Sequence, residues 1–218
     1  MITPIFTFDS HERWFPVGVE ESLKPFGYQW SPSLNAWVRN GDIVTRFDFP
    51  AGMKQGEFSP VGYHRVKDAM NLWWHQFWLW YRYNPKAYAG QGMHEGDWEF
   101  VQIGCADKAG NRPVLLTGSQ HHTGGARLWS RAVQRDGRPV VYVARDSHAN
   151  YWTPVADIED QCDGKGRVLE EIEWRPFGPW ASWPGRWGNS TGRGMSPESP
   201  GCQGHRWSRP DLYHGQAR

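Results

Sequence analysis

Hydrophobic positions in this chain gather in short runs that turn residues separate. Strands are predicted at 42–49, 71–84, 97–103, 113–117, 139–144 and 168–174. The longest run, 71–84, is apolar at almost every position, so periodicity alone does not separate helix from strand. Its aromatic content and the following Asn84-Pro85 favour a strand that is buried on both faces. Only 19–24 has the pattern of a short helix, so the fold is predicted to be mainly β, an antiparallel β-sandwich.

The spacing of these runs predicts one domain, 1–218, with three parts. Residues 1–65 are rich in aromatic and turn residues, and 66–175 hold the core strands. Residues 176–218 form an irregular tail of Gly, Pro, Ser, Arg and Trp. The tail has too little aliphatic content for a core of its own. We therefore expect its Trp side chains to pin it across the sandwich.

Composition narrows the possible functions. Lys and Arg number 24 against 23 Asp and Glu, a net charge of +1, which disfavours nucleic acid as a partner. The 15 Trp, 10 Phe and 8 Tyr exclude wholesale disorder. The first residues show no secretory signal, and the longest purely apolar run, Phe77–Tyr81, is far shorter than the roughly 20 residues of a membrane span. A soluble, cytoplasmic protein is the expectation.

The three cysteines, Cys105, Cys162 and Cys202, are too few for a disulfide framework. A bridge between Cys162 and Cys202 is one alternative. A structural zinc on Cys202, His205 and Cys162 is another, because Cys202 and His205 have a spacing that suits a metal.

The first polar cluster is HEGDWE, which starts at His94. In a strand, Asp97 and Glu99 share one face while Trp98 and Phe100 share the other. Two neighbouring carboxylates repel each other, so a cation, a basic side chain or protonation must offset the charge. Carboxylate oxygens beside an imidazole suit Mg, Ca, Mn or Zn. The alternative is a solvent-facing strand edge with surface carboxylates.

Two further clusters each follow an apolar strand. In SQHHTGG (119–125), adjacent His side chains rarely point the same way, so only one of His121 and His122 is expected to face a site. In RDSHANY (145–151), His148 suits a ligand or a general base, whereas Ser147 lacks the G-x-S-x-G of a nucleophile elbow. For both clusters the alternative is an ordinary hydrogen-bonded His. In an antiparallel meander the first two clusters can meet at one edge, and the third needs a crossover or a further strand between to join them.

These motifs carry a resemblance to a known family. The stretch WLWYRYNPKAYAGQGMHEGDWE (78–99), followed by SQHHTGG and VVYVARDSHANY, resembles the vacuolar protein sorting-associated protein 62 family. The tail segments WPGRWG, SPESP and QGHRWSRP and the opening PIFTFDSHERWFPVGVEESL also resemble that family. The resemblance covers most of the chain but implies no biochemical activity.

A more distant resemblance is to the necrosis- and ethylene-inducing-peptide-like cytolysins, whose signature is G-H-R-H-D-W-E. It implies a cytolysin- or jelly-roll-like sandwich with long Gly-, Pro- and Trp-rich loops and few short helices. It also implies a divalent cation held by His94, Asp97 and Glu99, and binding to sphingolipid head groups. Asn84 is the nearest counterpart of an upstream Asp in those toxins.

The first functional hypothesis is a divalent-cation-dependent hydrolase or lyase that acts on a glycan, a lipid head group or another small polar substrate. The metal ligands would be His94, Asp97, Glu99 and His121. The acid–base residues would be His148, His122 and Glu99. The substrate-binding residues would be Asn84, Arg145, Asp146, Asn150 and Tyr151. The alternatives are a non-catalytic, cation-assisted glycan or lipid-head-group binding protein, and a purely structural role for HEGDWE.

Overall fold

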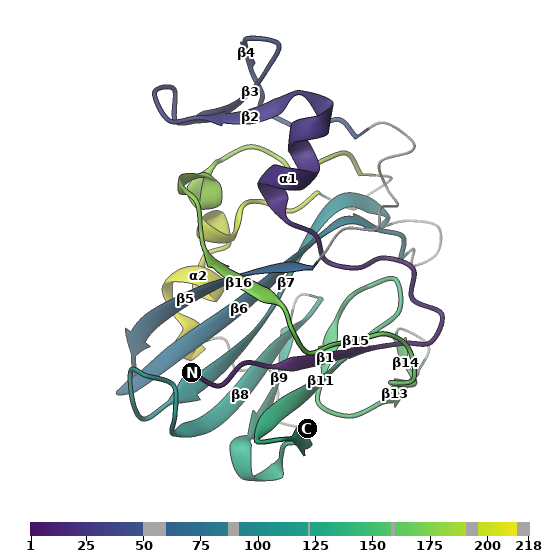
Figure 1. Ribbon diagram of the computed structural model, residues 1–218, viewed down its shortest axis with the longest axis vertical. Helices are drawn as coiled ribbons and strands as arrows, with labels where there is room; N and C mark the ends of the chain where they lie inside the picture. Colours follow the sequence, from purple (N-terminus) through teal and green to yellow (C-terminus); the bar gives the residue numbers. More distant parts are fainter. Residues whose placement is uncertain (50–59, 87–91, 122, 158–159, 191–195, 213–218) are drawn as a thin grey trace.

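The structure is a computed structural model that describes residues 1–49, 60–86, 92–121, 123–157, 160–190 and 196–212. Two packed sheets and a third, smaller one dominate it, and its helices are short (Figure 1). The predicted mainly β fold with few short helices is therefore confirmed. Within the described ranges, none of these helices is long and apolar enough to cross a membrane.

The larger sheet contains the motif strands in the order β16-β5-β6-β7-β8-β9. Their bounds are Glu173–Pro176, Val61–Ala69, Leu72–Asn84, His94–Cys105, Pro113–Gln120 and Thr123–Leu128. From β5 to β9 every pair is antiparallel, whereas β16 runs parallel to β5. The two longest strands, β6 and β7, lie at its centre. The side chains on both of their faces are buried along almost the whole of each strand.

The second sheet has the order β10-β11-β1-β15, with β12 paired to β11. The bounds are Gln134–Arg135, Arg138–Val143, Ile5–Phe8, Val168–Leu169 and, for β12, Asn150–Tyr151. β1 and β11 are parallel, and the other pairs are antiparallel. A separate hairpin, β13 (Val155–Ala156) with β14 (Gln161–Cys162), follows β12. The core between the two sheets is aliphatic and aromatic; it includes Phe6, Phe8, Phe77, Leu79, Val101, Ile103 and Val141.

The other face of the larger sheet is covered by the N-terminal region and by the tail. The N-terminal cover contains α1 (Val19–Leu23), the 3₁₀ turn η1 (Lys24–Phe26) and the small sheet β2 (Tyr28–Ser31), β3 (Ala36–Arg39) and β4 (Asp42–Ile43). Figure 1 shows this small sheet standing above the two larger ones, with α1 between. The tail contributes η4 (Pro179–Ser182), η5 (Pro200–Cys202), α2 (His205–Ser208) and η6 (Pro210–Leu212); η3 (Trp129–Arg131) lies after β9.

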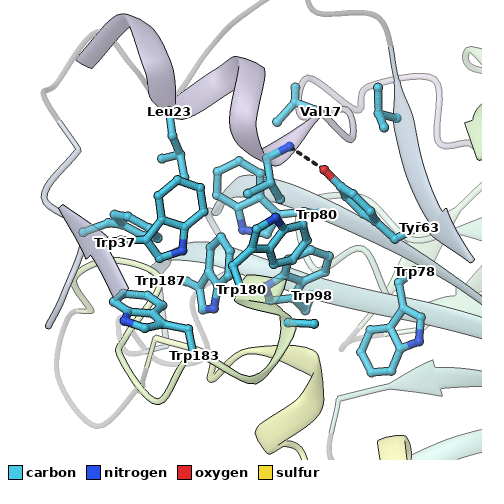
Figure 2. Packing of buried hydrophobic residues seen from close by; sticks show 14 of the residues in the cluster. Val17, Leu23, Trp37, Tyr63, Trp78, Trp80, Trp98, Trp180, Trp183 and Trp187 are labelled. Carbon is cyan, nitrogen blue, oxygen red and sulfur yellow. Dashed lines mark hydrogen bonds between the residues drawn. The ribbon is translucent and has the colours of Figure 1, made fainter. Parts of the chain in front are cut away.

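Tryptophan dominates the core under this cover. Trp80 and Trp98 of the sheet meet Trp180 and Trp187 of the tail, with ring centroids 5.3 to 6.3 Å apart (Figure 2). The Tyr63 hydroxyl accepts a hydrogen bond of 2.9 Å from the first amide of α1. Within its described residues, the tail thus shares its hydrophobic core with the sheet.

Buried glutamine amides also fix the tail. Gln76 and Gln102, both fully buried, donate to the backbone carbonyls of Arg206 and Pro210 at 2.7 and 2.9 Å. These two bonds tie α2 and the start of η6 to the central strands of the larger sheet.

Several predicted elements differ from the observed ones. In the predicted strand 42–49 only Asp42–Ile43 is a strand, and 168–174 is split between β15 and β16, which belong to different sheets. The sequence pattern missed β5 and β9 altogether. The cysteine bridge is also wrong, since Cys105, Cys162 and Cys202 are all unpaired.

Candidate functional site

The carboxylates of HEGDWE lie on the face of β7 that points toward the second sheet. Asp97 pairs with Tyr81 and Glu99 with Leu79 in the β6–β7 register, and Trp98 and Phe100 point into the opposite, tryptophan-rich core. The predicted division of the two faces is therefore confirmed. Asp97 and Glu99 are only 5% and 6% exposed, so the alternative of surface carboxylates is wrong.

Asp97 binds an imidazole that comes from the loop between β11 and β12. His148 Nδ1 lies 2.8 Å from Asp97 Oδ2, and Asn84 Nδ2 donates to the same oxygen at 3.3 Å. The Tyr81 ring stacks on the imidazole with centroids 3.8 Å apart. His148 is fully buried and has a left-handed backbone, φ 57°, a strained conformation that its surroundings must hold in place. We call Asn84, Asp97 and His148 the Asp97 network.

Glu99 is held differently. The Ser119 hydroxyl of β8 donates to Glu99 Oε2, and Asn150 Nδ2 donates to the Ser119 oxygen at 3.2 Å. Burial, and then the neighbouring Asp97, raise the pKa of Glu99 well above its usual range. This shift favours the protonated form of Glu99, and the imidazole of His148 lies beside Asp97, so both features reduce the repulsion between the two carboxyl groups.

A second buried carboxylate, which the sequence did not single out, collects three further side chains. Asp160 Oδ2 lies 2.7 Å from His121 Nε2 and accepts a 2.6 Å hydrogen bond from the Tyr151 hydroxyl, and Asp160 Oδ1 accepts one from Ser147. Burial alone would raise the pKa of Asp160, but the hydrogen bonds from His121, Ser147 and Tyr151 lower it to about 2. We call these four residues the Asp160 network.

The order of contacts in the Asp160 network excludes one kind of chemistry. In a serine hydrolase the imidazole lies between the serine and the carboxylate. Here the carboxylate of Asp160 lies between Ser147 and His121. Ser147 is therefore a structural residue, in agreement with its lack of a nucleophile-elbow sequence.

The two networks meet at the loop 144–149. Ser147 belongs to one and His148 to the other, and Asn84 Nδ2 lies 3.5 Å from the Ser147 carbonyl. The predicted clusters 94–99, 119–125 and 145–151 thus come together, and β12 is the further strand that joins the third cluster to the first two.

The remaining predicted residues lie at the rim of this arrangement. Arg145 donates from both its backbone amide and its guanidinium to Gln161 of β14, at 2.8 Å each. The Asp146 amide donates to Glu12 at 2.7 Å. His94 Nδ1 lies 2.7 Å from the Gly96 carbonyl, and His94 forms a bridge with Ser190 of the tail. His122 lies outside the described residues.

The predicted metal ligands are not gathered in one place. Among the described residues, no three His, Cys, Asp or Glu side chains are clustered closely enough to hold a metal ion. His121 is engaged with Asp160, and Asp97 Oδ2 is engaged with His148 and Asn84. As placed, these side chains bond one another, and a divalent cation stays a prediction from the sequence. The cysteine–histidine zinc alternative likewise has no such cluster in the described ranges.

A surface pocket lies beside Arg145. Its volume is about 360 Å³, within the range of small-molecule sites. The start of the chain after β1, the β13–β14 hairpin and Arg145 form its walls, with the lining residues Asp9, His11, Arg145, Pro154, Val155, Ala156, Gln161, Cys162 and Asp163.

Two kinds of polar group line this pocket. Asp9 accepts backbone hydrogen bonds from His11 and Asp163, at 2.9 and 3.1 Å, and Asp163 accepts the Ser10 amide at 2.9 Å. These carboxylates fix the pocket wall. His11, whose side chain is 75% exposed, and the ends of Arg145 and Gln161 are the groups placed to meet a ligand.

The sequence did not signal Asp9, Asp160, Gln161 or Asp163 as site residues. Each is an ordinary polar residue in a turn-rich segment, and its partners lie far away in the sequence: Asp9 and Asp163 are 154 residues apart. The pairing of β1 with β11 and β15, together with hydrogen bonds such as that from Thr7 to Gly164, brings the two segments together.

Comparison with known proteins gives a likeness of fold. No family model and no curated protein matches the chain, so the resemblance to the vacuolar protein sorting-associated protein 62 family rests on the sequence motifs alone. Solved structures of similar fold include Necrosis and Ethylene inducing Protein 2 from the causal agent of cocoa's Witches Broom disease, at 13% identity and a TM-score of 0.47, with 79% of this chain and 70% of that chain covered.

Others are the non-toxic HaNLP3 protein, at 12% identity and a TM-score of 0.46, with 73% and 69% of the two chains covered, and NLPPya in complex with glucosamine, at 11% identity and a TM-score of 0.46, with 73% and 68% covered. A likeness this low carries no conclusion about a ligand or an activity.

Proposed function

We propose that this chain is a binding protein for a small polar ligand of the saccharide class, and that the pocket beside Arg145 holds the ligand. The observation that carries the proposal is the contrast between two places. The predicted catalytic groups His148 and Glu99 are buried and bonded within the protein, whereas the pocket of about 360 Å³ is open at the surface and combines apolar side chains with the partly exposed His11, Arg145 and Gln161.

The lining of the pocket matches the chemistry of a sugar. Sugar hydroxyls both donate and accept hydrogen bonds, and sugar rings also present C–H faces. Arg145 supplies donors only, whereas Gln161 and His11 each supply a donor and an acceptor. Pro154 and Val155 supply apolar contact. Because the two carboxylates of Asp9 and Asp163 outweigh the single charge of Arg145, the site favours a neutral or amino sugar over a polyanion.

In this proposal the buried networks act as a support. The Asp97 network holds His148, and the Asp160 network holds Ser147. These two anchors fix the loop from which Arg145 reaches Gln161. A polar residue held by its neighbours loses less side-chain entropy when it binds a ligand.

The test is titration of the protein with glucose, mannose, glucosamine and mannosamine, followed by calorimetry or by backbone amide shifts. The two amino sugars are included because structures of similar fold are described with them. We expect Arg145→Ala to weaken binding at least about tenfold, since a hydrogen bond to a charged group contributes about 1.5–3 kcal/mol.

Arg135→Ala is the matched control. Arg135 is also exposed and paired with a carboxylate, that of Glu170, but it lies beyond the opposite end of β11. Equal loss of binding in both variants, or shifts that cluster away from Arg145 and Gln161, would contradict the proposal.

A divalent-cation-dependent enzyme is the second candidate, and one observation favours it. Among the described residues, the Nε2 atom of His148 is buried without a hydrogen-bond partner, while its other nitrogen is held by Asp97. A carboxylate that orients an imidazole in this way is typical of metal ligands and of general bases. Its test is melting in Mg, Ca, Mn and Zn: a stabilisation by one metal that Asp97→Asn abolishes would support this candidate, and unchanged melting would count against it.

A further inference from the structure

A pair of histidines lies on β5 and β6, away from both networks. His64 Nε2 and His75 Nδ1 are 3.1 Å apart. The two ring planes differ by only 19°, and the centroids are 5.3 Å apart, nearly the sum of the N···N distance and the two ring radii. The imidazoles therefore meet end to end in nearly one plane, and one nitrogen donates directly along the lone pair of the other.

This pair is covered by two segments. His75 is only 2% exposed, and the turn 106–112 lies against its ring, because a Cβ on Gly110 would come within 3.0 Å of its Nε2 atom. The Ile2 amide donates to the Gly110 carbonyl at 3.3 Å, so the start of the chain lies over the same turn. The ring of Phe77 contacts His64 from the core side, with centroids 5.1 Å apart.

The surroundings favour a neutral pair. Burial, then the neighbouring His75 and the N-terminal amine, lower the pKa of His64 to about 4. Burial, followed by the N-terminal amine, also lowers the pKa of His75, and the carboxylate of Asp107 opposes this only in part. The backbone of Lys108, on the same turn, acts in the same direction as Asp107, through a hydrogen bond that raises the pKa of His75.

We propose that the His64–His75 pair is an acid-sensitive latch that holds the turn 106–112 and the start of the chain against the larger sheet. When both rings are neutral, one N–H lies between the two facing nitrogens and the latch is closed. When both rings are protonated, two N–H groups face each other at a hydrogen-bond distance and their charges repel. The latch then opens, and the covering turn moves away while the strands stay paired.

The first test uses the wild-type protein. Ring NMR signals give the titration of His64 and His75, and amide exchange, corrected for the intrinsic effect of pH, gives the opening of the turn. The Ala106 and Gly110 amides report on it, because they donate to the Arg112 and Asp107 carbonyls. The pKa of His64 is about 4 in the closed state, against its ordinary value of 6.5, which we expect in the open state. The opening equilibrium should therefore rise on the order of 100-fold between pH 7 and pH 4. The exchange of amides in β6 and β7 should not show this rise.

A second test removes one ring. His64→Phe should flatten the pH dependence of exchange at Ala106 and Gly110, because a phenyl ring takes up no proton. His11→Phe is the control, since His11 is exposed and lies beyond the other end of β1 from Ile2, and it should leave the pH profile unchanged. The latch is wrong if His64 titrates near 6.5 in the folded protein, or if exchange in the turn does not depend on pH. Neither result depends on the wild-type protein binding a sugar.

Discussion

The two faces of β6 and β7 carry opposite chemistry on the same pair of strands. On one face, Trp78, Trp80 and Trp98 pack with the N-terminal region and the tail. On the other face, Asp97 and Glu99 bind side chains from β8 and from the loop 144–149. The first face contributes stability through a large buried apolar area, whereas the second fixes the direction of specific polar groups. Changes to the two faces should therefore have different consequences.

Removal of the tail should have the largest effect. A chain that ends at residue 175 loses Trp180, Trp183 and Trp187, all of which are buried against the sheet. We expect no cooperative folding, measured as the loss of a thermal transition and of near-ultraviolet circular dichroism. A truncated chain that melts at the wild-type temperature would show that the tail is dispensable.

A single substitution on the tryptophan face should come next. Trp98 contacts the rings of Tyr63, Trp180 and Trp187, so Trp98→Ala leaves a cavity that its neighbours cannot all fill. The expected loss in the free energy of unfolding is about 3–5 kcal/mol, measured by urea denaturation. Trp14→Ala, at a half-buried ring that packs on Tyr83, is the control and should cost clearly less. Equal losses would contradict the view that the tryptophan core makes the larger contribution to stability.

On the polar face, Asp97→Ala should cost about 1–3 kcal/mol, because it leaves the buried Nδ1 of His148 without its partner. Asp68→Ala, at an exposed carboxylate on β5, should change stability by no more than about 0.5 kcal/mol. The same urea experiment measures both. If Asp97→Ala were as stable as wild type, the Asp97 network would have no supporting role.

Acid should weaken the polar face at two different pH values. The pKa of Asp160 is about 2 in the folded protein against 3.8 as a model value, so its contribution of about 2 kcal/mol is complete above pH 3.8 and is lost as the pH falls toward 2. The pKa of His64 is lowered to about 4, so the folded state loses stability as the pH falls from 6.5 toward 4. Asp160→Asn should remove the lower step alone, measured by denaturant unfolding at a series of pH values. Persistence of the lower step in this variant would contradict its assignment to Asp160.

The sequence predicted the central strands and their faces for a simple physical reason. Residues 71–84 and 97–103 are neighbours in the chain and pair directly, so alternation alone placed Asp97 and Glu99 on one side. Antiparallel pairing of the next strand brought Ser119 to Glu99, as expected for neighbouring strand ends. Local pattern was sufficient for these central strands, but it missed β5 and β9, although their partners β6 and β8 are also their neighbours in the chain.

Where the partner lay far away in the sequence, local pattern was not sufficient. The run 168–174 looks continuous, yet β15 pairs with β1 and β16 with β5, so the chain crosses between sheets within it. The contact of Asp160 with His121 spans 39 residues, and the pocket needs Asp9 and Asp163 side by side. Nothing in the composition of those segments distinguishes them from ordinary turns.

The most direct test of the account is a crystal structure of the protein soaked with glucosamine and with a divalent cation such as Mn²⁺. The account predicts sugar density against Arg145 and Gln161, with the bond between Asp97 and His148 intact. Sugar or metal density at Asp97 and Glu99, with His148 turned away from Asp97, would contradict it and would make the buried carboxylates the functional centre.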